Sequence, residues 1–244
     1  MTDSSARRLA TAYDRLAQGG FVLVYDADGR EEEVDLFVAA ERATPAAVET
    51  LRRDAGGLVF LAVDAGVGAR LGLPFLHDLF RDAAAKHPVL AKLIPNDLRY
   101  DTRSSFSLTI NHRGTFTGIT DNDRSLTITE FGRLAARAPA LAPEEAQAAF
   151  GAAFRAPGHV HLCVGAPRPF VDRSGHTEIA VALARVAGVT PVLAGAEMLD
   201  RGVALSRSKA EAWARAHDTV VVTGEEIAAA YAKLHEQARP VVQR

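Results

Sequence analysis

Short apolar runs rich in β-branched residues alternate along this chain with segments of helical character, and this alternation restricts the fold more than any other feature. Runs at residues 21–25, 36–40 and 58–63 predict buried strands. Further strands are predicted at 104–110, 115–120, 159–164, 191–194 and 220–222. Because strands and helices interleave without regular β-α-β repetition, we expect a mixed α/β fold. It should form one domain over residues 1–244, in which helices flank a mixed sheet.

Capping residues and Gly or Pro stops predict the helices between these strands. Ser4 or Ser5 can cap a first helix that ends near Gly19 and Gly20. The remaining helices are expected to begin near Thr44, Thr127, Pro143, Thr177, Lys209 and Glu225. Residues 66–98 should be helical but irregular, because they are interrupted by Pro74, Pro88 and Pro95. A turn at 111–114 is predicted to join the strands 104–110 and 115–120 into a hairpin.

Charge and cysteine content exclude several classes of protein. The chain has 28 Lys and Arg against 30 Asp and Glu, a net charge of −2, whereas a protein that coats nucleic acid carries a marked basic excess. The single cysteine, Cys163, can form no intrachain disulfide and no thiolate zinc site, and its apolar neighbours predict a buried, inert thiol. No apolar run approaches the ~20 residues of a membrane span, and the N-terminus lacks a signal-peptide core. We therefore expect a cytoplasmic protein without nucleic-acid or membrane partners.

The acidic run between the first two predicted strands is the most unusual polar feature. It holds six carboxylates within ten residues, together with Arg30: Asp26, Asp28, Glu31, Glu32, Glu33 and Asp35. Such carboxylates repel one another unless a cation lies among them, and Mg²⁺ prefers oxygen ligands. Charge runs are more often solvated loops. The sequence leaves two interpretations open, an exposed hairpin loop and a divalent-cation site.

A second polar cluster, Arg173–Glu178, comes directly before an apolar helix. Ser174 or Thr177 can cap that helix, and the backbone amides of a helix N-terminus attract anions. Arg173 adds a bidentate phosphate partner, and His176 adds a metal ligand or a further phosphate contact. The cluster predicts either a phosphate-binding turn or an ordinary capping box.

Three further features supply candidate residues. His159 follows a predicted Pro-Gly turn and enters a strand, a place suited to acid–base chemistry, although a structural role is commoner and is the one expected for His161. Glu197 follows an apolar strand, and carboxylates at strand ends often face sites in α/β folds. Thr115–Arg124 predicts a polar turn that binds a sugar hydroxyl or closes a hairpin.

Common nucleotide and hydrolase motifs do not occur in the chain. The Walker, GxGxxG, GxSxG and HExxH patterns are missing, which argues against ATP hydrolysis, nicotinamide chemistry and serine hydrolysis. Considered together, the polar clusters predict a divalent metal, a phosphate and a general acid or base.

Six segments carry a resemblance to a known family: Tyr25–Asp35, Asp54–Leu58, Ser104–Arg113, Thr115–Arg124, Arg155–Val160 and Gly175–Glu178. In their residues and in their order along the chain, these segments resemble 3,4-dihydroxy-2-butanone 4-phosphate synthase, especially its archaeal branch. The likeness spans most of the chain. The resemblance implies a lyase of riboflavin biosynthesis. Its reaction converts D-ribulose 5-phosphate into L-3,4-dihydroxybutan-2-one 4-phosphate and formate through a metal-stabilised enediolate.

The resemblance also implies roles for individual residues. Glu31 and His176 would hold Mg²⁺, with Mn²⁺ as the alternative and two ions per site once substrate is bound. The sugar phosphate would be bound by Arg30, Glu31, Asp35, Thr117, Arg173, Ser174, Gly175, His176 and Thr177. Catalysis would fall to His159, Glu197, Asp35, Glu33 and Asp26. The family works as a homodimer with residues of both subunits near each site, so a homodimer is expected here.

The chain departs from the family pattern in three places, of which the turn Arg173–Thr177 is a mild change that leaves the phosphate-binding turn intact. The acidic run Glu31–Asp35 lacks the glycine that many members have there, and the segment Ala196–Gly202 is altered and shortened after Glu197. The cysteines of a fused GTP cyclohydrolase II module are missing, so a monofunctional enzyme is expected. Two other functions stay open, another metal-dependent phosphosugar isomerase or aldolase and a non-catalytic sugar-phosphate-binding relative.

Overall fold

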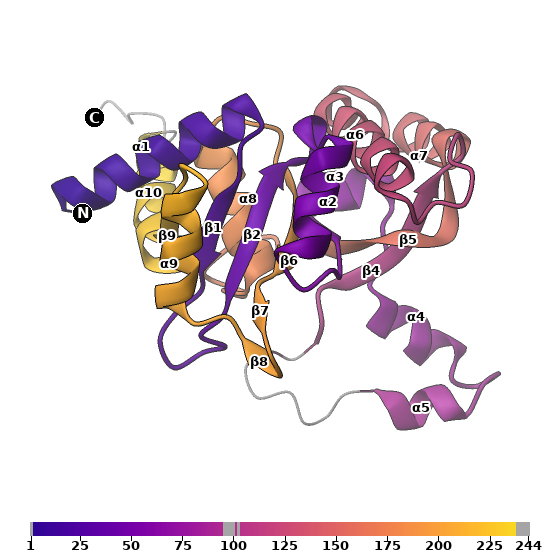
Figure 1. The fold of residues 1–244 in the computed structure, drawn as a ribbon. Helices are drawn as coiled ribbons and strands as arrows, with labels where there is room; N and C mark the ends of the chain where they lie inside the picture. The colour runs from indigo at the N-terminus through magenta and orange to yellow at the C-terminus, as the bar shows by residue number, and fades with distance from the viewer. Residues whose placement is uncertain (1, 95–100, 102, 238–244) are drawn as a thin grey trace, which may run out of the picture.

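A seven-stranded mixed sheet forms the centre of the protein (Figure 1). The computed structural model describes residues 2–94, 101 and 103–237. The strand order is β4-β5-β3-β6-β2-β1-β9, and a short β7–β8 hairpin stands apart from this sheet. The strands are β1 (Val22–Tyr25), β2 (Val34–Ala39), β3 (Phe60–Val63), β4 (Phe106–His112), β5 (Phe154–Val164), β6 (Val192–Glu197), β7 (Leu199–Asp200), β8 (Val203–Ala204) and β9 (Val221–Thr223). The expected mixed α/β fold is confirmed.

Helices cover both faces of the sheet, as Figure 1 shows. They are α1 (Asp3–Gln18), α2 (Pro45–Arg53), α3 (Ala65–Leu71), α4 (Leu76–Ala83), α5 (Val89–Leu93), α6 (Asp121–Arg137), α7 (Pro143–Ala153), α8 (His176–Val186), α9 (Arg207–Ala216) and α10 (Gly224–Gln237), with 3-10 turns η1 (Ala40–Arg42) and η2 (Ala138–Ala140). None of the helices in the described part of the chain is long and apolar enough to cross a membrane.

Two hydrophobic clusters lie on opposite faces of the sheet. Along β2, Leu36 and Val38 belong to one cluster, whereas Phe37 and Ala39 belong to the other, because successive side chains of a strand point to opposite faces. The first cluster contains residues of α2, α3, α6, α7 and α9, and the second contains residues of α1, α8 and α10. Burial on both faces explains why the central strands are continuous apolar runs.

The predicted hairpin at 104–120 is wrong. Residues 111 and 112 continue β4, and residues 116–118 form a loop whose backbone N–H groups donate to Asp123 over 3.3, 3.1 and 2.8 Å. Helix α6 begins at Asp121, not near Thr127, because the Thr120 side chain accepts the N–H of Asp123 over 3.1 Å. The side chains of Thr120 and Asp123 therefore accept hydrogen bonds from backbone N–H groups here. In a strand, these N–H groups would have needed a neighbouring strand as their partner.

The Pro-Gly turn predicted before His159 is instead a bulge within β5: Arg155 pairs with Asn111 and Val160 with Ile110, so residues 156–159 have no register partners on β4. A Cβ atom on Gly158 would come within 2.0 Å of the Ile110 backbone on β4. The glycine therefore serves the close approach of two strands rather than a turn. Farther back, residues 66–98 are helical and irregular as expected, with α3, α4 and α5 separated by loops; Pro95 lies outside the described residues.

Because Gly195 has no side chain, aromatic rings from the two neighbouring strands can pack over it. It lies on β6, opposite Phe37 of β2 and Phe60 of β3, and the two rings meet edge to face at 5.8 Å between centroids. A Cβ atom on Gly195 would come within 2.4 Å of the Phe37 ring. Any side chain here forces the ring out of its position.

We expect Gly195→Ala to destabilise the protein by about 1–3 kcal/mol, the usual effect of overpacking a core. Thermal unfolding followed by circular dichroism would show a melting temperature several degrees lower. The matched control is Gly151→Ala on α7, where a new Cβ meets no atom within 4 Å. The control should melt at the same temperature or higher, since Ala favours helix. An unchanged melting temperature for Gly195→Ala would contradict this account of the packing.

Candidate active site

The acidic run connects β1 to β2 and is folded around one buried carboxylate. Asp26 is 1% exposed and accepts hydrogen bonds from the backbone N–H groups of Glu31 and Glu33 over 3.0 and 3.1 Å. Asp35, at the other end of the run, is also 1% exposed, whereas Asp28 at the tip is exposed. Each of the two sequence interpretations therefore describes one part of the run, because its tip is solvated and its ends are built into the protein.

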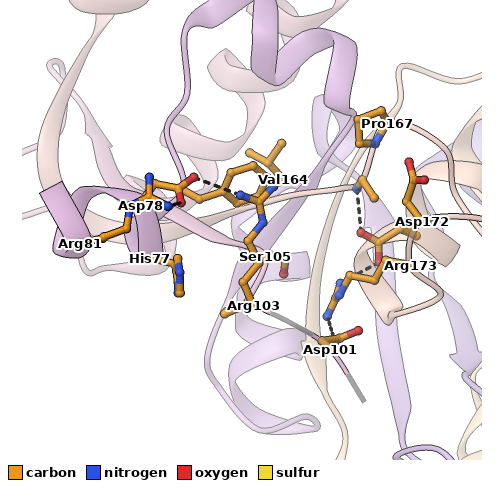
Figure 2. A pocket seen from close by; sticks show the side chains of 14 residues that line it. His77, Asp78, Arg81, Asp101, Arg103, Ser105, Val164, Pro167, Asp172 and Arg173 are labelled. Atoms are coloured by element: carbon orange, nitrogen blue, oxygen red, sulfur yellow. Dashed lines mark hydrogen bonds and ion pairs between the residues drawn. The ribbon is translucent and has the colours of Figure 1, made fainter. Parts of the chain in front are cut away.

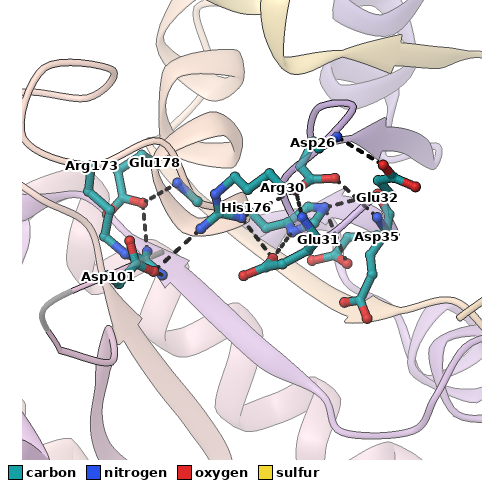
Figure 3. Close-up of polar contacts among 12 residues, drawn as sticks. Asp26, Arg30, Glu31, Glu32, Asp35, Asp101, Arg173, His176 and Glu178 are labelled. Atoms are coloured by element: carbon teal, nitrogen blue, oxygen red, sulfur yellow. Dashed lines mark hydrogen bonds and ion pairs between the residues drawn. The ribbon is translucent and has the colours of Figure 1, made fainter. Parts of the chain in front are cut away.

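His176, the first residue of α8, faces this loop (Figure 3). Its Nδ1 lies 3.3 Å from Oε2 of Glu31, and its Nε2 lies 3.3 Å from the carbonyl oxygen of Glu33. The same Nε2 lies 3.7 Å from Oδ1 of Asp35. The ring is 9% exposed, so these contacts are largely removed from water.

Three donor groups meet at this point in a way that suits a divalent cation. One ligand atom each from Asp26, Glu31 and His176 lies within 4.8 Å of the other two. Carboxylate oxygens are the ligands that Mg²⁺ prefers, and the ion keeps several waters when few protein groups bind it. From the sequence we expect Asp26 to be a catalytic group, and the structure adds it to the possible ligands.

Mutual charge controls the protonation of this cluster. The hydrogen bond with His176 and the charge of Arg30 lower the pKa of Glu31 to about 2. Burial disfavours a charge on His176, but the neighbouring Asp35, Glu31 and Asp26 outweigh burial and raise its pKa to about 9. At neutral pH an imidazolium therefore balances the carboxylates.

The buried carboxylate of Asp35 is incompletely hydrogen-bonded. Burial raises its pKa to about 7, although the nearby His176 opposes this shift. Its Oδ1 has no hydrogen-bond partner among the described residues. Asp35 lies opposite Glu197 in the β2–β6 ladder, so both carboxyl groups are on the same face of the sheet. A carboxyl group with this pKa can exchange a proton near neutral pH.

Two arginines extend the cluster toward the start of α8 (Figure 3). Nη1 of Arg30 lies 2.8 Å from Oε2 of Glu31, and Nη2 lies 3.4 Å from Oδ2 of Asp101. Nη2 of Arg173 lies 2.7 Å from the same Asp101 oxygen. One carboxylate therefore joins both guanidinium groups, which share a face suited to binding an anion.

The turn before α8 is capped differently from the prediction. The N-cap residue is Gly175, not Ser174 or Thr177. A Cβ atom at this position would come within 2.6–2.8 Å of the Arg173 guanidinium, so any other residue here would displace the end of that side chain. The turn is instead closed by Glu178, a fully buried carboxylate that accepts the N–H of Gly175 over 3.1 Å and pairs with Arg173 over 2.7 Å.

A polar cavity of about 650 Å³ lies beside this turn (Figure 2). Asp101, Arg173 and Glu178 belong both to its lining and to the cluster described above. On the opposite side it is lined by Arg103 and by His77 of α4. The arginine side of the site therefore opens into a space larger than the metal-ligand cluster itself.

His159 and Thr117 lie away from this cluster within one chain. His159 is on β5, and β3 and β6 separate it from β2; three strand spacings of about 4.8 Å correspond to roughly 14 Å. Its exposed ring contacts Asn111. Thr117 is exposed on the loop that Asp123 organises.

Several supporting residues were not predicted from the sequence. The side chain of Asp101 contacts Arg173, that of Asn111 contacts His159, and that of Asp123 contacts Thr117. No local motif indicates the contacts of Asp101 and Asn111. The only local signal was the spacing of Thr120 and Asp123, which matches a helix cap. The contacts of Asp101 and Asn111 join separate segments, so they depend on the fold.

Comparison with known proteins identifies the family. Residues 10–230 match the family model described as 3,4-dihydroxy-2-butanone 4-phosphate synthase. A protein of that name from Methanothermobacter thermautotrophicus is 44% identical over 222 residues, which cover 90% of this chain and 94% of the relative. Another from Methanosarcina mazei is 41% identical, with 93% and 92% covered.

Solved structures agree with these sequence matches. A 3,4-dihydroxy-2-butanone 4-phosphate synthase crystallised in complex with two magnesium ions superposes with a TM-score of 0.70 at 25% identity, covering 93% of this chain and 97% of that one. The match along nearly the whole chain, together with the fold, establishes that the protein belongs to the 3,4-dihydroxy-2-butanone 4-phosphate synthase family.

Proposed function

We propose that the cluster between β1, β2 and the start of α8 carries out the reaction of this family. The reaction is that of a lyase in riboflavin biosynthesis, which converts D-ribulose 5-phosphate into L-3,4-dihydroxybutan-2-one 4-phosphate and formate. The observation that carries the proposal is the meeting of Asp26, Glu31 and His176 beside two arginines. A metal site next to an anion site is what a phosphosugar with adjacent carbonyl and hydroxyl groups requires.

Glu31, His176 and Asp26 would hold the divalent cation. When bound, the cation supplies Lewis-acid polarisation of the sugar oxygens. Magnesium is our first assignment, with manganese as the alternative and two ions per site in the presence of substrate. The support is the oxygen-rich donor set here and the relative that was crystallised with two magnesium ions.

Arg30, Arg173 and the turn through Thr177 would bind the phosphate. The N-terminus of α8 points its free backbone N–H groups into this turn, which includes Ser174 and the capping residue Gly175. In the unliganded protein Asp101 lies between the two guanidinium groups, so a phosphate would replace a carboxylate there. Anchoring the phosphate would hold the open-chain sugar in register for the chemistry.

Asp35, Glu33 and Glu197 would carry out proton transfers. Burial raises the pKa of Asp35 to about 7, so this group can accept and return a proton near neutral pH, and burial also raises the pKa of Glu33. Glu197 stays opposite Asp35 although the following segment differs from the family pattern, because residues 199–204 form the separate β7–β8 hairpin. The altered segment therefore leaves this pair of carboxylates in place.

We further propose a homodimer in which His159 and Thr117 reach the cluster of the second copy. Within one chain His159 is three strands away from β2, too far to contact a substrate held there. The loop that carries Thr117 exposes Phe116 by 93% and Ile119 by 51%, and such side chains favour burial against a partner. That residues 1–244 act as one monofunctional, cytoplasmic domain without nucleic-acid or membrane partners stays a prediction from the sequence.

We expect the purified protein to release formate from D-ribulose 5-phosphate in the presence of magnesium. Chelation with EDTA should abolish the release, and added magnesium or manganese should restore it. Coupled formate dehydrogenase provides the measurement. Conversion of the substrate without formate would instead indicate an isomerase or aldolase, and thermal protection by the substrate without turnover would indicate a binding protein.

His176→Ala should abolish formate release and also the stabilisation of the fold by magnesium. A cation present at 100 times its dissociation constant adds about 2.7 kcal/mol to the free energy of unfolding, which a melting curve detects readily. The control is His217→Ala at the exposed end of α9. Both effects of magnesium should survive in the control. Full activity in His176→Ala would refute the metal assignment.

Mixing two inactive variants tests the shared site. In a mixed dimer of His159→Ala and His176→Ala subunits, one of the two sites has both histidines intact. Random mixing should restore about one quarter of the activity of the unmodified protein, since half of the dimers are mixed and each has one complete site. Co-expression with two affinity tags would isolate the mixed dimer. If it is as inactive as its parents, both histidines serve a site within one chain.

A further inference from the structure

We propose that Asn111 is a positioning residue that makes His159 a neutral hydrogen-bond donor through Nε2, and not a base. The inference rests on the proposed function, which brings His159 to a substrate. It concerns a contact between β4 and β5 that lies outside the metal-ligand cluster.

The two side chains meet through both branches of the Asn111 amide. Asn111 is on β4 and is only 4% exposed. Its Oδ1 accepts a hydrogen bond from the backbone N–H of His159 over 2.9 Å. Its Nδ2 lies 3.1 Å from Nδ1 of the His159 ring.

The backbone fixes which branch of the amide is oxygen. A backbone N–H can only donate, so the amide atom 2.9 Å from it must be the acceptor. The other branch is then the NH2 group, which has no lone pair to offer. Gly118 leaves room for this amide, because a Cβ atom there would lie 2.0 Å from Nδ2 of Asn111.

This arrangement determines where the ring carries its proton. Nδ1 of His159 lies 3.1 Å from the amide NH2 nitrogen and 3.4 Å from Oδ1, which already accepts the backbone N–H. We assign the shorter contact as the hydrogen bond, so that the NH2 group donates and Nδ1 holds a lone pair. A neutral imidazole with a free Nδ1 carries its proton on Nε2. The His159 residue is exposed, and its Nε2 has no hydrogen-bond partner among the described residues.

As a consequence, His159 and the metal-ligand cluster would have different roles in the reaction. A neutral imidazole that presents Nε2–H can polarise a carbonyl oxygen or stabilise the oxyanion that develops from it. It offers no lone pair at Nε2 to remove a proton from carbon. Proton removal then falls to other groups of the proposed site.

Selective ¹⁵N labelling of histidine tests the tautomer directly and without activity. In the unmodified protein, at a pH where the ring is neutral, the His159 resonances should show a pyridine-like Nδ1 and a pyrrole-like Nε2. They are identified by their loss in His159→Gln. Asn111→Asp replaces the donor by an acceptor and should move the proton to Nδ1. A protonated Nδ1 in the unmodified protein would overturn the proposal.

Kinetics show whether the tautomer matters to the reaction. Removing an oxyanion donor costs about 100-fold or more in kcat, and we expect Asn111→Asp to lose about that much while KM changes by about twofold or less. The pH profile of kcat should also change shape. In the His159→Gln background, Asn111→Asp should have no further effect, because it acts through the ring.

Two controls separate this inference from other failures. Thr127→Val removes a buried side chain that accepts the N–H of His112, the next residue of β4, and should lower stability without moving the His159 proton. If Asn111→Asp does not fold, Asn111→Ser takes its place, because it also removes the amide NH2 group. The spectrum of the unmodified protein still tests which ring nitrogen of His159 carries the proton. An unmodified protein that releases no formate refutes the proposed function, whereas a normal kcat in Asn111→Asp with a switched tautomer refutes only this inference.

Discussion

The contact between Glu31 and His176 holds the functional part of the molecule together. It joins the loop after β1 to the start of α8, two segments 145 residues apart in the sequence. The loop can reach α8 because Asp26 folds it back on itself through the N–H groups of Glu31 and Glu33. Without this closure the acidic run would project into water, and its carboxylates would lie too far from the histidine to share a cation.

The electrostatics of the cluster follow from concentrating acids in a poorly hydrated place. Several carboxylates close together raise the pKa of His176, and burial raises that of Asp35. A divalent cation bound by Glu31 would take over the balancing role of the imidazolium, since a metal-bound histidine must be neutral. The same groups thus suit both the empty and the loaded site.

The sheet provides the rigid frame for these groups. Register in the β2–β6 ladder sets Asp35 against Glu197, and the small Gly195 lets Phe37 and Phe60 pack over β6 nearby. Near the β4 edge of the sheet, the β4–β5 contact orients the ring of His159 through Asn111. Because strands hold side chains more precisely than loops do, reactive groups at both places keep defined orientations.

The sequence by itself determined the fold class, most strands and helices, and the two polar segments that form the site, because periodicity and capping are local properties. It could not place the residues between Asn111 and Thr120, where one carboxylate, Asp123, satisfies three backbone groups and favours a loop over a strand. Nor could it pair Arg30 with Arg173 through Asp101, or Asn111 with His159, since these contacts join distant segments. Only the tertiary structure decided them, because burial and strand order set both the protonation of Asp35 and the distance of His159 from the metal ligands.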